Sequence, residues 1–212
     1  MLFTRLHFWV FFTILLAFYT ILYRRNVLRN AYLFLMSLIF YYYSGGYFFT
    51  LLIFSTISDY TLGHLIYRAN KHKLKSLFLT LSVVINLGVL SYFKYSYFFT
   101  DMVNRIFGTQ LEVVNLLARW SNQIANTGFD VGTIILPVGI SFYTFQTISY
   151  TVDIYRGKIK PVNNIVDFGF YVSFFPQLVA GPIVRAAEFV PQLYQQFRLT
   201  RREFGHALFL IL

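Results

Sequence analysis

Long stretches without any charged residue constrain this chain more than any other feature of its sequence. From Ala31 to Ser58 no acidic or basic residue occurs. An α-helix rises about 1.5 Å per residue and the hydrocarbon layer of a bilayer is about 30 Å thick, so about 20 apolar residues suffice to cross it. The stretch is too long for one such span, and Ser44-Gly45-Gly46 lies where a tight turn would divide it. We therefore expect two membrane helices there.

Further apolar segments predict an all-α, polytopic transmembrane protein. Only 12% of the residues are charged and 57% are hydrophobic, whereas about a quarter of a soluble domain is charged. Leu6 to Tyr23 forms a first span, which no small-residue cleavage site follows, so it is not a cleavable signal. Additional spans are expected at 47–67, 76–93 and 131–152, and a further hydrophobic helix begins at Ala207. Within 131–152, Pro137 and Gly139 would bend or open the helix.

Residues 100–130 carry charges among apolar residues and do not predict a span. Leu111, Val114, Leu117 and Ala118 would share one face of a helix. That spacing predicts a short amphipathic helix on the membrane surface.

The uncharged segment from Phe168 to Val184 is interrupted twice, by Phe175-Pro176 and by Gly181-Pro182. Proline removes a backbone donor and clashes with the preceding turn. Broken helix at membrane depth must be buried in protein or line a wet cavity. We therefore expect a broken, re-entrant helix near the cytoplasmic side.

The net charge of +10 is distributed in short clusters between the apolar runs. A nucleic-acid interface needs a solvated basic face, which this pattern does not provide. Basic clusters mark cytoplasmic loops. An outward-facing N-terminus would place four clusters in the cytoplasm, at 24–29, 68–75, 156–160 and 185–202. The expected location is a bacterial inner membrane, crossed several times.

Few residues suggest chemistry on their own. The absence of cysteine excludes a thiol nucleophile and a disulfide framework, and no paired histidines predict a metal site. Asp59 lies in the third span, with His64 beyond it. An ionisable residue in a span indicates function by default. The alternative is interfacial snorkelling or a structural pair with a nearby cation. None of the four histidines, His7, His64, His72 and His206, is expected to be catalytic.

The segment after Leu136 is unusually polar for a span. Its hydroxyl and amide side chains are Ser141, Tyr143, Thr144, Gln146, Ser149 and Tyr150. Two interpretations remain open, because such residues either form hydrogen bonds between helices or line a polar tunnel.

Three phrases in this half of the chain resemble signatures of the membrane-bound O-acyltransferase family. They are Pro-Val-Gly-Ile-Ser-Phe-Tyr-Thr-Phe-Gln from Pro137, Val-Asp-Ile-Tyr-Arg-Gly from Val152 and Ser-Phe-Phe-Pro-Gln-Leu-Val-Ala-Gly-Pro-Ile-Val-Arg from Ser173. Ala180 and Val184 make the last phrase more similar to the alginate O-acetyltransferase branch than to the D-alanyl-lipoteichoic acid branch, where Ser-Gly-Pro-Ile-Asp-Arg is expected. The likeness extends over essentially all 212 residues.

The resemblance implies a ring of tilted helices around a tunnel. An acyl donor, acetyl-CoA or an acyl carrier, would act as a cytoplasmic substrate, with no bound cofactor. The acceptor would be a polysaccharide or a secreted acetyltransferase partner outside. The family's catalytic histidine is expected beyond Leu212, so residues 1–212 are expected to form the N-terminal part of one membrane domain and to be inactive alone. The candidate tunnel or donor-side residues are Ser141, Tyr143, Gln146, Asp153, Arg156, Gln177 and Arg185.

The function expected from the resemblance is O-acetyl transfer across the membrane to an exopolysaccharide such as alginate. The alternatives are D-alanyl transfer to teichoic acid, a multi-span transporter of glycans or lipid-linked substrates, and a membrane scaffold without chemistry. A repeat of this half with inverted topology would favour transport, whereas an apolar helix with a lone histidine would favour acyl transfer.

Overall fold

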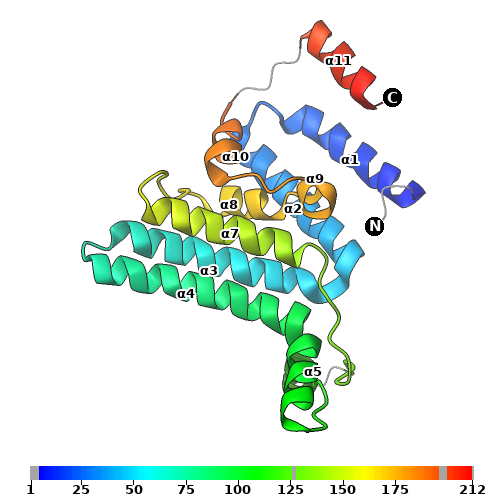
Figure 1. The fold of residues 1–212 in the computed structure, drawn as a ribbon. Coiled ribbons are helices and arrows are strands. Elements are labelled where there is room, and N and C mark those ends of the chain that lie inside the picture. Colours follow the sequence, from blue (N-terminus) through cyan, green and yellow to red (C-terminus); the bar gives the residue numbers. More distant parts are fainter. Residues whose placement is uncertain (1–4, 126–127, 196–199, 212) are drawn as a thin grey trace.

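The computed structural model describes residues 5–125, 128–195 and 200–211, and every regular element in these ranges is helical (Figure 1). The elements are α1 (Leu6–Leu22), α2 (Asn26–Gly45), the 3₁₀ turn η1 (Gly46–Phe48), α3 (Phe49–Arg68), α4 (His72–Leu90), the π-helical turn η2 (Ser91–Tyr95), α5 (Ser96–Phe107), α6 (Leu116–Ala125), α7 (Ile140–Tyr155), α8 (Ile165–Ser173), α9 (Phe175–Ala180), α10 (Ala186–Gln192) and α11 (Arg201–Ile211). The predicted all-α fold class is confirmed.

The main core lies where α3, α4 and α7 run side by side and α8 packs against α3 (Figure 1). Its fully buried side chains include Leu52 and Ile66 of α3, Tyr150 of α7 and Phe168 of α8. The second half of the chain thus packs between helices of the first half. A smaller aromatic cluster joins α1, α2 and α9.

Two glycines permit this packing. A Cβ atom on Gly63 of α3 would lie 2.9 Å from a ring carbon of Tyr150 and 3.0 Å from the terminal methyl of Ile154, so only glycine allows α3 and α7 to approach so closely. Gly139, immediately before α7, has a φ of 73°, in the left-handed region that glycine adopts without steric cost. The chain can therefore turn sharply into α7 at this residue.

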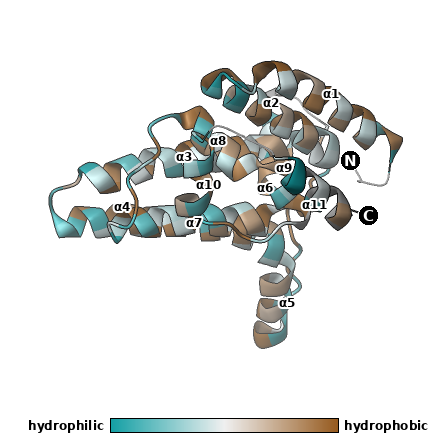
Figure 2. Ribbon diagram, turned by 90° about the horizontal axis from the view of Figure 1, so that it is seen from above, coloured by the Kyte–Doolittle hydropathy of each residue, from teal (hydrophilic) through white to brown (hydrophobic). Residues whose placement is uncertain are grey.

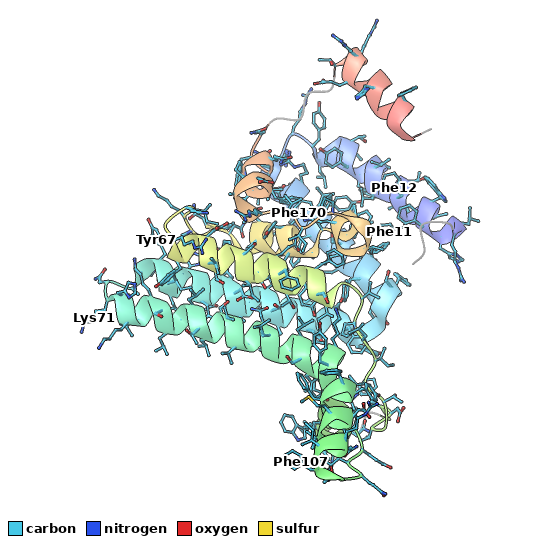
Figure 3. The ribbon with its side chains drawn as sticks, viewed as in Figure 1. Phe11, Phe12, Tyr67, Lys71, Phe107 and Phe170 are labelled. Atoms are coloured by element: carbon cyan, nitrogen blue, oxygen red, sulfur yellow. The ribbon has the colours of Figure 1, made fainter. Side chains whose placement is uncertain are left out.

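Several predicted spans correspond to observed helices. The expected first span is α1. The expected turn at Ser44-Gly45-Gly46 is found where α2 ends at Gly45, and the next residue, Gly46, has a φ of 62°. By length and composition, two helical stretches are suited to crossing a membrane: Asn26–Arg68, which contains α2, η1 and α3, and His72–Phe107. Figure 2 shows mostly hydrophobic residues along α1 and hydrophilic residues at the turn between α3 and α4. Figure 3 shows Lys71 at that turn.

The expected single span at 131–152 is wrong in its first half. Residues 128–139 are not helical, and α7 begins only at Ile140. Pro137 disfavours helical backbone at the residue before it, and Gly139 takes a left-handed conformation. The break is therefore stronger than the bend that the sequence predicted.

The apolar helix face expected from Leu111 to Ala118 is also wrong. Leu111 and Val114 precede α6, which begins at Leu116, so they do not share a helix with Leu117 and Ala118. Of these four side chains only Ala118 is buried. A surface location for α6 stays a prediction.

The two expected breaks after Phe168 are present. α8 ends at Ser173, α9 spans only Phe175–Ala180, and extended backbone follows from Gly181. Neither short helix could cross a bilayer alone, given about 20 residues per span. A re-entrant path for this segment stays a prediction.

Candidate functional site

A buried polar network surrounds Asp59 at the centre of the three-helix core. The Asp59 side chain is completely buried. Its Oδ1 accepts a hydrogen bond of 2.6 Å from the Ser82 hydroxyl, and its Oδ2 accepts one of 2.8 Å from the Asn86 amide. The Asn86 Oδ1 in turn accepts from the hydroxyls of Ser55, at 3.1 Å, and Thr147, at 3.0 Å. The network thus fills the space between the helices with paired polar atoms.

Each of the three helices contributes two polar residues that are four positions apart. They are Ser55 and Asp59 on α3, Ser82 and Asn86 on α4, and Thr147 and Thr151 on α7. Residues at i and i+4 lie on the same face of a helix. The hydroxyls of Ser82 and Thr151 lie 3.0 Å apart and complete the connection between α4 and α7.

The alternative explanation of Asp59, as an interfacial residue paired with a cation, is wrong. Its partners are neutral, and the ion pair recorded among the described residues, Arg105 with Asp101, lies on α5. His64 lies apart from this network, with its Nδ1 2.9 Å from the Tyr60 carbonyl of its own helix. The histidine therefore adds no proton-transfer partner to Asp59.

The sequence drew attention to Asp59 but not to its partners. In each helix taken alone, nothing marks the partners as members of a network, since serine and threonine are common in membrane helices. These partners are Ser55, Ser82, Thr147 and Thr151. The available signal was the recurrence of polar pairs at a spacing of four in three apolar helices. In the described chain, no three histidine or acidic side chains come together as a metal site.

A second face of α7 carries three of the residues expected to line a tunnel. Tyr143, Gln146 and Asp153 are 1%, 2% and 6% exposed. Their spacing of three and seven places them along one side of the helix. The structure therefore brings these three into the interior together.

The other four candidates are separated from this face. Ser141 is half-buried at the start of α7, with the Lys94 ammonium 3.4 Å from its hydroxyl. Gln177 is buried in α9 and donates to the Pro182 carbonyl at 3.0 Å, so it closes the turn between the two proline breaks. Arg156 and Arg185 are exposed. A role at the donor side stays a prediction for both arginines.

Several polar atoms near α7 are buried without a hydrogen-bond partner. They are the Tyr143 hydroxyl, the Thr144 hydroxyl, the Gln146 amide nitrogen and the Ser173 hydroxyl on α8. Leaving such a group unpaired costs about 1 to 3 kcal/mol, and unpaired groups are uncommon in folded proteins. Three of the four, Tyr143, Thr144 and Gln146, lie within about one turn of α7. Unpaired polar atoms are therefore concentrated near the start of α7, whereas the polar atoms around Asp59 are paired.

Comparison of the sequence with known proteins finds relatives that are named as acetylating enzymes. The chain is 36% identical over 168 residues to the "Probable alginate O-acetylase AlgI" of Pseudomonas aeruginosa, covering 77% of this chain and 29% of that protein. The protein of the same description from Azotobacter vinelandii is also 36% identical over 168 residues, covering 77% of this chain and 30% of the relative. The "Peptidoglycan O-acetyltransferase" of Helicobacter pylori is 30% identical over 195 residues, covering 80% and 34%.

The chain spans about a third of the length of the curated relatives it matches. No family model matches it. No solved structure matches it either.

The described chain is entirely helical in its regular elements, and two of its helical stretches are long and apolar enough to cross a membrane, which is typical of a membrane protein. The relatives identify the class more closely. The resemblance to the membrane-bound O-acyltransferase family is confirmed: the chain is a member related to alginate O-acetylases and to a peptidoglycan O-acetyltransferase.

Proposed function

We propose that the protein containing this chain transfers an acetyl group to hydroxyl groups of an exopolysaccharide such as alginate. The observation that carries the proposal is the 36% identity to alginate O-acetylases over 77% of the chain. The buried polar face of α7 supports it, because acyl transfer needs a reaction path closed against water. The membrane topology that we propose is multi-pass, in a bacterial inner membrane.

In this proposal α7 forms part of the wall of a transfer tunnel. Tyr143 and Gln146 supply hydrogen-bonding atoms that no group in the described chain occupies. An acyl thioester carries a carbonyl oxygen that accepts hydrogen bonds, and a sugar hydroxyl both donates and accepts them. The unpaired Tyr143 hydroxyl and Gln146 amide could form hydrogen bonds with either reactant. We assign them to binding and orientation.

The donor is proposed to enter from the cytoplasmic side as acetyl-CoA or an acyl carrier. Arg156 and Arg185 are exposed basic residues, and exposed guanidinium groups recognise phosphates by paired hydrogen bonds. The acetyl group would then reach the polysaccharide, or a secreted acetyltransferase partner, on the outer side. The Helicobacter relative favours peptidoglycan as a second candidate acceptor.

The experiment uses the full-length protein in a strain that depends on it for polymer acetylation. Gln146→Leu removes the unpaired amide while keeping a side chain of similar size, and Tyr143→Phe removes only the hydroxyl. We expect each variant to lower the acetyl content of the secreted polymer by about tenfold, the effect of losing about 1.4 kcal/mol of transition-state stabilisation.

Phe145→Leu serves as the matched control, because Phe145 lies on α7 but is 49% exposed on its outer side. Its acetyl content should equal that of the wild type. Normal acetylation in both interior variants, at equal protein abundance, would remove α7 from the reaction path. Loss of acetyl groups from peptidoglycan with alginate unchanged would instead select the second acceptor.

A further inference from the structure

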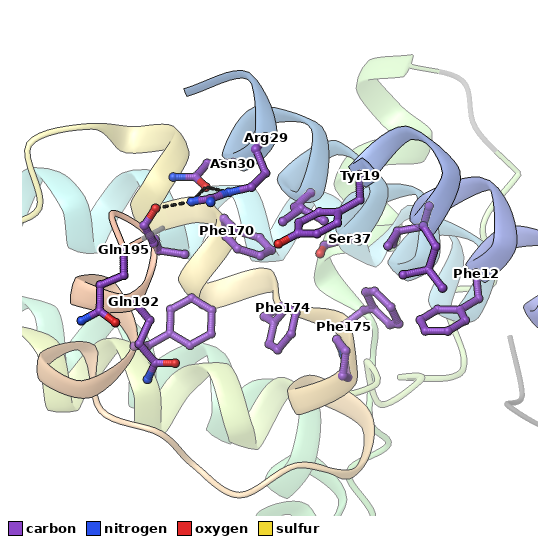
Figure 4. A pocket seen from close by; sticks show the side chains of 16 residues that line it. Phe12, Tyr19, Arg29, Asn30, Ser37, Phe170, Phe174, Phe175, Gln192 and Gln195 are labelled. Atoms are coloured by element: carbon purple, nitrogen blue, oxygen red, sulfur yellow. Dashed lines mark hydrogen bonds between the residues drawn. The ribbon is translucent and has the colours of Figure 1, made fainter. Parts of the chain in front are cut away.

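A separate cavity of about 650 Å³ lies between the N-terminal helices and the broken segment (Figure 4). Its size is in the range of small-molecule binding sites, about 300 to 1,000 Å³. Side chains of α1, α2, α8, α9 and α10 line it, among them Leu16, Arg29, Leu33, Ser37, Phe170 and Phe175. The wall is mostly apolar and aromatic, with no acidic residue.

Arg29 supplies the one positive charge among these lining residues, and it is only 5% exposed. Its guanidinium donates to the Asn30 side-chain oxygen, at 3.1 and 3.2 Å, and to the Leu193 carbonyl. Both acceptors are neutral, and no ion pair involving Arg29 exists among the described residues. A buried charge without a counter-charge is costly. The cavity therefore has an electrostatic preference for an anion.

The acidic group of this hydrogen-bond network, Asp167, does not contact Arg29 directly. Asp167 accepts from the Asn30 amide at 2.8 Å and from the Tyr194 hydroxyl at 2.6 Å. Asn30 thus separates this carboxylate from Arg29. Arg29 is therefore held by neutral acceptors and forms no direct ion pair with this carboxylate.

A second, independent observation comes from Ser37. Its side chain is 1% exposed, it forms part of the cavity wall, and its hydroxyl has no hydrogen-bond partner. Arg29, Leu33 and Ser37 follow one another at a spacing of four on α2, so they lie along one side of the helix. Eight residues of helix extend about 12 Å. The cavity thus presents a cation, an apolar stretch and a free hydroxyl in sequence.

We propose that this cavity binds an anionic glycerophospholipid, with its phosphate at Arg29 and an acyl chain against the phenylalanines of α1, α8 and α9. Arg29 lies near the start of α2, one turn after the exposed Arg24 and Arg25. Basic pockets between membrane helices on the cytoplasmic side bind anionic headgroups. The cation is therefore at the level where headgroups lie, and the apolar wall extends from it toward the membrane interior. The proposal does not depend on acetyl transfer.

The test is native mass spectrometry of the purified full-length protein, incubated with phosphatidylglycerol or with phosphatidylcholine. The wild type should retain phosphatidylglycerol in preference to phosphatidylcholine. Arg29→Gln keeps hydrogen-bond donors but removes the charge, and should lower phosphatidylglycerol retention at least about fivefold, the effect of about 1 kcal/mol per basic residue at a lipid surface. Arg24→Gln, an exposed residue outside the cavity, should leave retention unchanged.

A second variant fills the cavity without touching the charge. Leu16→Trp adds volume at a wall position that is 46% exposed, so the fold should tolerate it. Leu16→Trp should lower retention of both lipids. If Arg29→Gln fails to fold, this variant alone tests whether lipid binds in the cavity. Equal retention of both lipids by the wild type, or unchanged retention in Leu16→Trp, would overturn the proposal. So would a photo-crosslinker at Leu33 that captures another segment of the same protein instead of lipid.

Discussion

The carboxyl group of Asp59 connects three helices through side chains that are individually unremarkable. Both of its oxygens accept from α4, while Thr147 and Thr151 link the same cluster to α7. Buried polar groups are retained only when they are paired, because an unpaired donor loses its interactions with water and gains none. The network therefore makes the relative positions of α3, α4 and α7 interdependent.

Replacing Asp59 by alanine should destabilise the protein by about 2 to 5 kcal/mol, because it leaves the Ser82 hydroxyl and the Asn86 amide without their acceptor. Thermal unfolding of the full-length protein in detergent measures the change. Thr61→Ala is the control, since its exposed hydroxyl donates only to the Ile57 carbonyl of the same helix. Equal melting temperatures for the two variants would show that the network contributes little.

Tyr194 provides a pH-dependent prediction outside the membrane segments. Partial burial, followed by its hydrogen bond to Asp167, raises the pKa of this phenol from 10.0 to about 12. A raised pKa in the folded state means that its contribution to stability is complete below pH 10 and is lost as pH rises through about 12. The difference between ultraviolet titrations of the wild type and Tyr194→Phe isolates this group. A midpoint at or below 10 would contradict the prediction, and Asp167→Asn should shift the midpoint downward.

At the scale of elements, close helix contact at Gly63 and the break before α7 decide how the second half of the chain joins the first. The contact lets Tyr150 and Ile154 lie directly against the backbone of α3. The break shortens α7 to 16 residues, and its polar faces then lie within the core instead of facing lipid. The close contact depends on the absence of a side chain at Gly63, and the break depends on its absence at Gly139.

Gly63→Ala should therefore destabilise the protein by about 1 to 3 kcal/mol, the usual cost of overpacking a close contact. Gly88→Ala on α4 is a matched control, because a Cβ atom there meets nothing within 4 Å. Alanine favours helix over glycine by about 1 kcal/mol, so the control should be as stable as the wild type or more so. Thermal unfolding distinguishes the two variants. Equal effects would indicate that α3 and α7 can separate without cost.

At the scale of the whole molecule, the orientation in the membrane follows from the distribution of basic residues. Lys71 lies at the turn between α3 and α4 (Figure 3). Ser44 lies in the last turn of α2, just before the start of α3 and so at the other end of that helix. The basic cluster at 68–75 predicts that the turn at Lys71 faces the cytoplasm and that the turn after Ser44 faces outward.

The full-length protein with a single cysteine at either position tests this orientation, since this part of the chain has no native cysteine. In intact cells, an impermeant thiol reagent should label Ser44→Cys and spare Lys71→Cys. Both should react after the membrane is opened, which controls for accessibility. Labelling of Lys71→Cys in intact cells would reverse the topology.

The sequence by itself determined the helical class, the break at Gly46, the interruptions around Pro176 and Gly181, and the family. These depend on local chemistry: apolar runs, glycine, proline and contiguous motifs act within a few residues of where they occur. It overestimated the helix before Gly139 and the amphipathic face before α6, because periodicity does not reveal where local backbone preferences end a helix.

Only the tertiary structure decided which polar residues meet. Asp59 finds its partners 23 and 27 residues away, and Arg29 contacts the Leu193 carbonyl 164 residues away. A hydrogen bond needs two groups at about 3 Å, and sequence spacing fixes that distance only within one helix. Packing of separate helices pairs the polar groups around Asp59, leaves polar atoms of α7 unpaired and buries the charge of Arg29. Such packing depends on the whole chain and cannot be read from any one segment.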